Sequence, residues 1–206
     1  MADPLPFDPI AEARRQWVEH GWADAADGMA AITSIIRVEQ IVLGRAEALL
    51  RPLGLTFARY EVLVLLYFSR KGQLPLGKMG ARLMLHQASV TNLIDRLVQQ
   101  GYVEREPHPT DRRTTLATLT DEGRGIMEDA TRAVVDARIG VAELTAREAS
   151  DLHRTLRKLR IGAGDFDEAL PVDDEHLDRR AEPIAPERRR LVTPKPGGGS
   201  WFRTRR

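Results

Sequence analysis

The chain of 206 residues contains no cysteine. It therefore has no disulfide framework, no thiolate metal site and no cysteine-based peroxide switch. Its five histidines are scattered, with no pair four residues apart that would suit a metal on one helix face. The sequence also lacks a serine nucleophile elbow and a glycine loop placed between a strand and a helix for phosphate binding. These absences argue against an enzyme, a metal site and a bound cofactor.

Long apolar runs are missing as well. No stretch approaches the roughly 18 consecutive apolar residues of a membrane span, and the N-terminus lacks the basic and apolar regions of a signal peptide. A composition of 42% apolar and 30% charged residues is typical of a soluble globular protein. We therefore expect a cytoplasmic protein without a membrane partner. The net charge of +1 does not by itself indicate a nucleic-acid partner.

The most informative segment runs from residue 76 to residue 120. Apolar residues recur there at helical spacing in two short stretches, with a break near Leu85 and a stop at Gly101. The second stretch predicts an amphipathic helix. Its polar face carries small hydrogen-bonding side chains and one guanidinium, which suit base edges and phosphates of double-stranded DNA: Gln87, Ser89, Thr91, Asn92 and Arg96. The pattern predicts a helix that enters a major groove.

Two strand-like runs follow, over residues 102–106 and 113–118, and the segment between them contains two prolines. Prolines and Thr110-Asp111 are typical of a turn, so we expect a stiff hairpin with a protruding tip. Arginine at such a tip suits a narrow minor groove, and a neighbouring carboxylate could orient it. The candidate DNA-binding residues here are His108, Asp111, Arg112 and Arg113. The alternative is an ordinary surface hairpin with solvated charges.

These elements, followed by Leu119-Thr120-Asp121-Glu122-Gly123-Arg124, resemble the MarR family of winged helix-turn-helix regulators. The resemblance covers roughly residues 25 to 160. It implies a homodimer that binds a short inverted repeat, usually represses, and releases DNA when a small, often phenolic or carboxylated, molecule binds. The chain departs from many relatives at Gln87, where proline is common, and at Gly80, where alanine is usual.

The rest of the chain is predicted to be helical, with long helices on both sides of the reading unit. An apolar stripe runs through residues 24–50, Thr120 is a helix cap for a segment carrying Ile126 to Ile139, and Thr145 with Glu148 forms a capping box. We expect a mainly α (α+β) fold: a winged helix-turn-helix with long N- and C-terminal dimerisation helices and a small β-hairpin wing. Packing within one chain is the alternative to dimerisation.

Three regions are expected. Residues 1–23 form an extension with an extra helix, residues 24–160 the winged domain, and residues 161–206 a disordered charged tail. Seven acids occur between Asp165 and Asp178 and nine Lys/Arg between Arg179 and Arg206, with five prolines in the tail. The basic half either adds phosphate contacts or serves only as a solubilising tail.

An effector site is sought among aromatic and cationic residues, because such a set suits a planar anion: Trp17, His20, Trp22, Arg37, Arg59 and Tyr60. The tryptophans have an alternative role as helix-packing residues. The extra helix resembles that of a urate-sensing branch of the family, which has an aspartate where this chain has Glu61. The predicted function is a DNA-binding repressor released by an organic effector; the alternative is an effector-independent activator or architectural module with the same fold.

Overall fold

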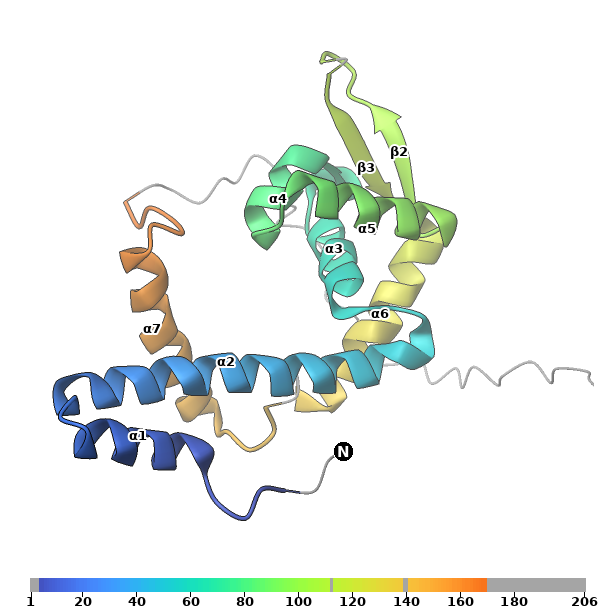
Figure 1. Ribbon diagram of the computed structural model, residues 1–206. Coiled ribbons are helices and arrows are strands. Elements are labelled where there is room, and N and C mark those ends of the chain that lie inside the picture. The colour runs from blue at the N-terminus through green and yellow to red at the C-terminus, as the bar shows by residue number, and fades with distance from the viewer. Residues whose placement is uncertain (1–3, 112, 139–140, 170–206) are drawn as a thin grey trace, which may run out of the picture.

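The computed structural model describes residues 4–111, 113–138 and 141–169, and it has the predicted mainly α architecture (Figure 1). The helices and strands follow one another as α1 (Pro9–Glu19), α2 (Ala23–Leu50), η1 (Arg51–Leu53), α3 (Phe57–Tyr67), η2 (Arg70–Gly72), β1 (Gln73–Pro75), α4 (Leu76–Leu83), α5 (Gln87–Gln99), β2 (Val103–Pro107), β3 (Thr115–Leu119), α6 (Asp121–Asp136) and α7 (Ala146–Gly162). No helix in these ranges is long and apolar enough to cross a membrane.

The helix starts follow the sequence signals. Asp8 caps α1 by accepting a hydrogen bond from the Ile10 amide at 2.9 Å, and the next turn at Gly21 has a φ of +87°, which favours glycine. Thr120 caps α6. Thr145 and Glu148 form the predicted capping box at α7, where hydrogen bonds from the Thr145 amide and hydroxyl lower the pKa of the Glu148 carboxyl.

The sheet has one strand more than the sequence predicts. Its antiparallel order is β1-β3-β2, with Leu74 and Arg105 both opposite Ala117. Strand β1 has only three residues, too few to display the alternation by which strands are recognised. Figure 1 shows that β2 and β3 extend beyond the helices as the expected wing.

The core lies between α3, α4, α5, α6 and the base of the sheet. Leu63, Leu66, Ile94 and Leu97 are fully buried, and Met127 from α6 joins the same cluster. The same cluster takes further side chains from α4 and the sheet, so its packing holds α5 against these elements.

Helices α2 and α7 differ from this core. The predicted apolar stripe of α2 is buried towards its end, at Ala46 and Leu50, but in the first two thirds of the helix a row of apolar residues is exposed in the single chain, although α1 packs along the same helix. We call this the α2 apolar stripe: Ile32, Ile35, Ile36, Val38, Ile41 and Leu43. No described residue of α7 is buried, and Leu152 and Leu159 are exposed.

One predicted helix boundary is wrong. Helix α6 ends at Asp136 rather than continuing towards Ile139, because Arg138 has a φ of +50° and its guanidinium donates to the carbonyls of Ala142 and Leu144 at 3.0 and 2.7 Å. The side chain of Arg138 thus binds two backbone carbonyls of the segment that precedes α7. Ile139 itself lies outside the described residues.

Helix α7 continues to Gly162, next to the expected start of the tail at residue 161. The chain then turns back, and the Phe166 ring lies under the guanidinium groups of Arg157 and Arg160, at 5.1 and 5.2 Å from its centroid. Arg160 and Asp165 form an ion pair at 2.6 Å that closes this turn. The rest of the predicted tail, residues 170–206, lies outside the described residues.

Candidate nucleic-acid interface

Helix α5 presents the polar face that the sequence predicts. Val90, Ile94 and Leu97 are buried on one side, and the opposite side exposes Gln87, Ser89, Asn92 and Arg96. The Ser89 and Asn92 side chains have no partner among the described residues. The Arg96 guanidinium is exposed, and within the described part of the chain it donates only a long hydrogen bond, 3.4 Å, to Gln99. These groups are available to an external partner such as a base edge or phosphate.

Thr91 differs from its neighbours. It is half-buried, and its hydroxyl donates to the carbonyl of Gln87 one turn earlier, at 3.0 Å. The hydroxyl oxygen can still accept a hydrogen bond, but its proton is engaged within the helix. At the start of α5, His86 Nδ1 accepts from the Ala88 amide at 3.4 Å and so caps the end of the helix that carries the reading residues.

The turn between α4 and α5 explains why position 80 is a glycine, where alanine is usual in the family. Gly80 is buried, and a Cβ added there would lie 2.9 Å from the Leu85 carbonyl oxygen. The Leu85 amide donates to the Gly80 carbonyl at 2.9 Å, so the chain after α4 folds tightly back over this residue. Gly80 therefore permits a close approach of backbone to backbone that alanine would disturb. That packing sets how α4 leads into α5.

The wing tip is held by His108 and Asp111. His108 Nδ1 accepts from the Asp111 amide at 3.2 Å, while the Asp111 carboxylate accepts from the Arg113 amide at 3.0 Å and from the Thr114 hydroxyl at 2.7 Å. The hydrogen bond from Thr114, followed by that from Arg113, lowers the pKa of Asp111. Asp111 thus shapes the turn through these two groups, whereas we expected it to orient a guanidinium. Arg113 is exposed, and Arg112 lies outside the described residues.

A link between wing and helix was not foreseen. Arg105 of β2 donates to the Thr91 carbonyl at 3.2 Å and pairs with the Asp95 carboxylate at 2.9 Å. Arg105 thus neutralises an acid of α5 and connects the wing to that helix. The sequence shows both charged residues, Asp95 and Arg105, but it does not show that they pair, because their contact depends on how the hairpin folds against α5.

The base of the wing is joined just as closely to α6. The Thr120 hydroxyl donates to the Gly101 carbonyl at 2.8 Å and accepts from the Gly123 amide at 2.9 Å. A Cβ on Gly123 would lie 2.0 Å from the Tyr102 carbonyl oxygen, so no other residue fits at this contact. The end of α5, the base of the wing and the start of α6 therefore meet without space between them.

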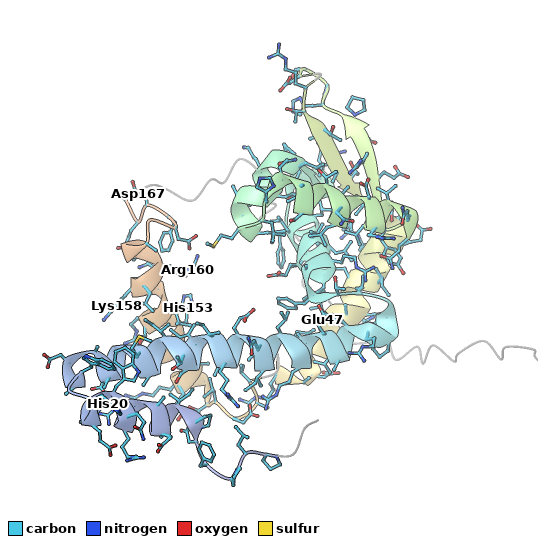
Figure 2. All side chains as sticks on the ribbon, in the orientation of Figure 1. His20, Glu47, His153, Lys158, Arg160 and Asp167 are labelled. Carbon is cyan, nitrogen blue, oxygen red and sulfur yellow. The ribbon has the colours of Figure 1, made fainter. Side chains whose placement is uncertain are left out.

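The candidate effector residues fall into separate groups. The Trp17 and Trp22 rings have centroids 5.4 Å apart and His20 stacks on Trp22 at 6.2 Å, at the end of α1 shown in Figure 2. A cavity of about 330 Å³ beside them is lined by Trp17, Gly21, Trp22, Asp24 and Ala25. Trp22 is 58% exposed, which does not fit the alternative role of a packing residue within this chain.

The other three candidates lie elsewhere. Arg37 is exposed on α2. Arg59 donates to the Gln100 side chain at 2.8 Å, and the Tyr60 hydroxyl lies 3.1 Å from that of Thr131 on α6. One chain therefore does not bring the six residues into a single pocket. Among the described residues, no cluster of His, Asp and Glu could hold a metal ion.

Comparison with known proteins agrees with this arrangement. A family model described as the MarR family matches residues 55–115. The chain is 52% identical to the solved structure of Sco5413, a MarR family transcriptional regulator from Streptomyces coelicolor; the match covers 69% of this chain and 99% of that one, with a TM-score of 0.64. The chain belongs to the MarR family. Its relatives are transcriptional regulators that bind DNA, and the predicted family and fold are confirmed.

Two further MarR-family structures are similar to this protein. Sco3205 from Streptomyces coelicolor, solved in complex with DNA, is 26% identical over 70% of this chain and 92% of its own, with a TM-score of 0.61. CouR from Rhodococcus jostii RHA1, solved with p-coumaroyl-CoA bound, is 30% identical over 65% of this chain and 92% of its own, with a TM-score of 0.56. Members of the family thus include proteins with DNA and with a small-molecule ligand.

Proposed function

We propose that this MarR-family protein is a homodimeric repressor that binds an inverted-repeat DNA operator and releases it when a small organic effector binds. The observation that carries the proposal is the exposed polar face of α5, where Ser89, Asn92 and Arg96 have side chains available to DNA, beside a wing that projects in the same region. Helix and wing are linked through Arg105, so they would reach DNA together.

The α2 apolar stripe supports the homodimer. Ile32 and Ile36 are each 53% exposed, and Ile35 is 40% exposed, at a spacing that places all three on one side of the helix. A contiguous apolar surface of this kind marks an interaction site, and the exposed leucines of α7 add to it. A second copy would bring the same surface, which is the usual arrangement of a two-fold dimer.

An effector is supported by the CouR complex and by the aromatic cluster at Trp17, His20 and Trp22. Two indole faces beside a cavity of about 330 Å³ suit a planar ring. The only charged residue lining that cavity is Asp24, so the cationic donors for a carboxylated effector would come from another element or from the partner subunit. A protein that keeps its operator in the presence of every effector would instead be an effector-independent module.

The reading helix can be tested with DNA selected from a random library by the full-length protein. We expect an inverted repeat whose half-sites lie about 10 bp apart. Asn92→Ala and Arg96→Ala should each weaken binding to it by about 1 to 3 kcal/mol without changing the fold. Arg147→Ala, which removes an exposed arginine on α7, is the control and should bind like the parent. Parental affinity in both α5 variants would rule out this helix as the reader.

Effector release is tested separately, by adding aromatic acids and acyl-CoA thioesters to the complex with the selected DNA. Trp22→Ala should then need a higher effector concentration while binding DNA as before. Release of the variant at the parental concentration would place the effector elsewhere.

A further inference from the structure

A chain of hydrogen bonds connects α2 to the end of the reading helix. Figure 2 labels Glu47 on the part of α2 that lies near α3 and α6. Its carboxylate accepts from the Phe57 amide at 2.9 Å, so a side chain of α2 caps the first turn of α3. In the same turn, Arg59 donates through Nε to the Thr56 hydroxyl at 3.2 Å, which leaves the other side of its guanidinium free to reach α5.

Gln100 completes the connection. This residue caps the C-terminus of α5, and its side-chain oxygen Oε1 accepts from Arg59 Nη1 at 2.8 Å. The side-chain nitrogen Nε2 of Gln100 donates to the Gly54 carbonyl at 3.1 Å, in the turn between α2 and α3. Gly54 has a φ of +70°, a conformation that favours glycine and that turns the chain immediately after α2. One amide therefore holds both the turn after α2 and the start of α3.

We propose that Gln100, together with Arg59, is a positioning residue that fixes the angle of α5 relative to the dimerisation helices and so sets which half-site spacing the dimer accepts. The inference rests on the proposed homodimer. Helix α5 has 13 residues and is therefore about 20 Å long. A small rotation about its C-terminal end would move the reading residues near its N-terminus by a large part of a base-pair step.

The hydrogen bonds are suited to this role because they add direction to a contact that the core does not determine. The apolar side of α5 is held by Ile94 and Leu97, but apolar packing is non-directional and tolerates small rotations. The opposite attachment of the same helix end, between the Gly101 carbonyl and Thr120 at 2.8 Å, leads to α6. The end of α5 is thus attached on one side to the α2–α3 corner and on the other to α6.

The first test needs no DNA. Because the chain has no cysteine, a cysteine introduced by Ser89→Cys is the single site for a spin label in each protomer. Pulsed electron paramagnetic resonance on the labelled dimer then measures the separation of the two reading helices. We expect one narrow distance distribution in the parent and a distribution about twice as broad when Gln100→Leu is added, since that change keeps the volume and removes both hydrogen bonds. Gln99→Leu, one residue earlier on the exposed face, is the matched control and should leave the distribution narrow.

The second test uses the DNA selected by the full-length protein, with its centre lengthened or shortened by 1 or 2 bp. The parent should lose roughly tenfold in affinity for each base pair, whereas Gln100→Leu should discriminate by less than about threefold. Gln100→Glu keeps the acceptor for Arg59 and loses the donor to Gly54, so it should fall between the two. This variant also remains informative if Gln100→Leu does not fold.

A folded, dimeric Gln100→Leu with the parental distance distribution and the parental spacing preference would overturn the positioning role. Two other results point to a different failure. A parent that gives no interprotomer distance, or that selects no inverted repeat, would show that the proposed homodimeric function is wrong, whatever Gln100 does.

Discussion

The winged unit, from α3 to α6, encloses an apolar core, whereas the long helices α2 and α7 leave apolar side chains exposed. In the core between α3 and α6, Leu63, Leu66 and Ile94 have no exposed surface. On α2, by contrast, the residues of the α2 apolar stripe are 39–53% exposed, although Ala46 and Leu50 at the end of the same helix are buried. Both patterns have helical spacing, so spacing alone does not say whether a partner is needed. The winged unit thus completes its own core, while α2 and α7 leave apolar side chains exposed that the proposed dimer would cover.

The largest effect should follow from placing a charge in the α2 apolar stripe. Ile35→Asp would bury a carboxylate in the proposed dimer interface, where an unpaired charge is not tolerated. We expect a monomer in light scattering at micromolar concentration and a loss of DNA affinity of about a hundredfold or more, since two half-sites would no longer be bound together. Ile35→Val, which keeps the surface apolar, should remain a dimer.

A persistent dimer of Ile35→Asp would show that α2 is exposed for a different reason. Helix α7, whose Leu152 and Leu159 are also exposed, would then be the candidate dimer surface. Leu159→Asp, tested in the same way, would decide which of the two helices forms the dimer interface.

The second prediction concerns the tightly packed contact between α6 and the base of the wing. Gly123→Ala would place a methyl group against the Tyr102 carbonyl, at the 2.0 Å contact described above. Because the neighbouring atoms are backbone, they cannot rotate away, and we expect a loss of about 3 kcal/mol in the free energy of unfolding, measured with denaturant.

Gly125→Ala in the same helix is the matched control. A Cβ there would meet nothing within 4 Å, so this change should raise stability by up to about 1 kcal/mol through helix propensity. Equal effects of the two substitutions would mean that the junction between α6 and the wing is less tightly packed than these contacts indicate.

A third prediction separates attachment from charge at Arg105. If Arg105 acts by holding the wing to α5, Arg105→Ala and Asp95→Ala should both weaken DNA binding, by about tenfold or less, because an exposed ion pair is worth up to about 1 kcal/mol. If only charge matters, Asp95→Ala should instead tighten binding, since it removes a negative charge near phosphates. The affinities are best compared at two salt concentrations.

Much of this arrangement could be predicted from sequence, and the failures have a common cause. The polar face of α5, the caps at Thr120 and Thr145 and the wing all depend on residues close together in the chain, where periodicity and turn chemistry are informative. Strand β1 was missed because three residues carry no pattern. The contacts of Arg105 with Asp95 and of Arg59 with Gln100 join separate elements, and no local pattern reveals which charges or amides will meet. Arg59 was accordingly assigned to an effector site, whereas its described contacts are within the reading unit.

The smallest effect is expected at the wing tip, through Asp111. Its pKa lies below the ordinary value of 3.8 because the ionised carboxylate accepts from Thr114 and Arg113. For an acid with a lowered pKa in the folded state, the stabilisation is fully present above the ordinary value and is lost as the pH falls through the lowered pKa. Wing-tip order, measured by amide hydrogen–deuterium exchange corrected for its intrinsic pH dependence, should therefore be constant at neutral pH and decrease only in strong acid.

Asp111→Asn keeps an oxygen for the Arg113 amide and should bind DNA within about threefold of the parent, whereas Asp111→Ala should loosen the tip at every pH. A tip that loosens well above this acid range would show that a group other than the Asp111 carboxylate holds it.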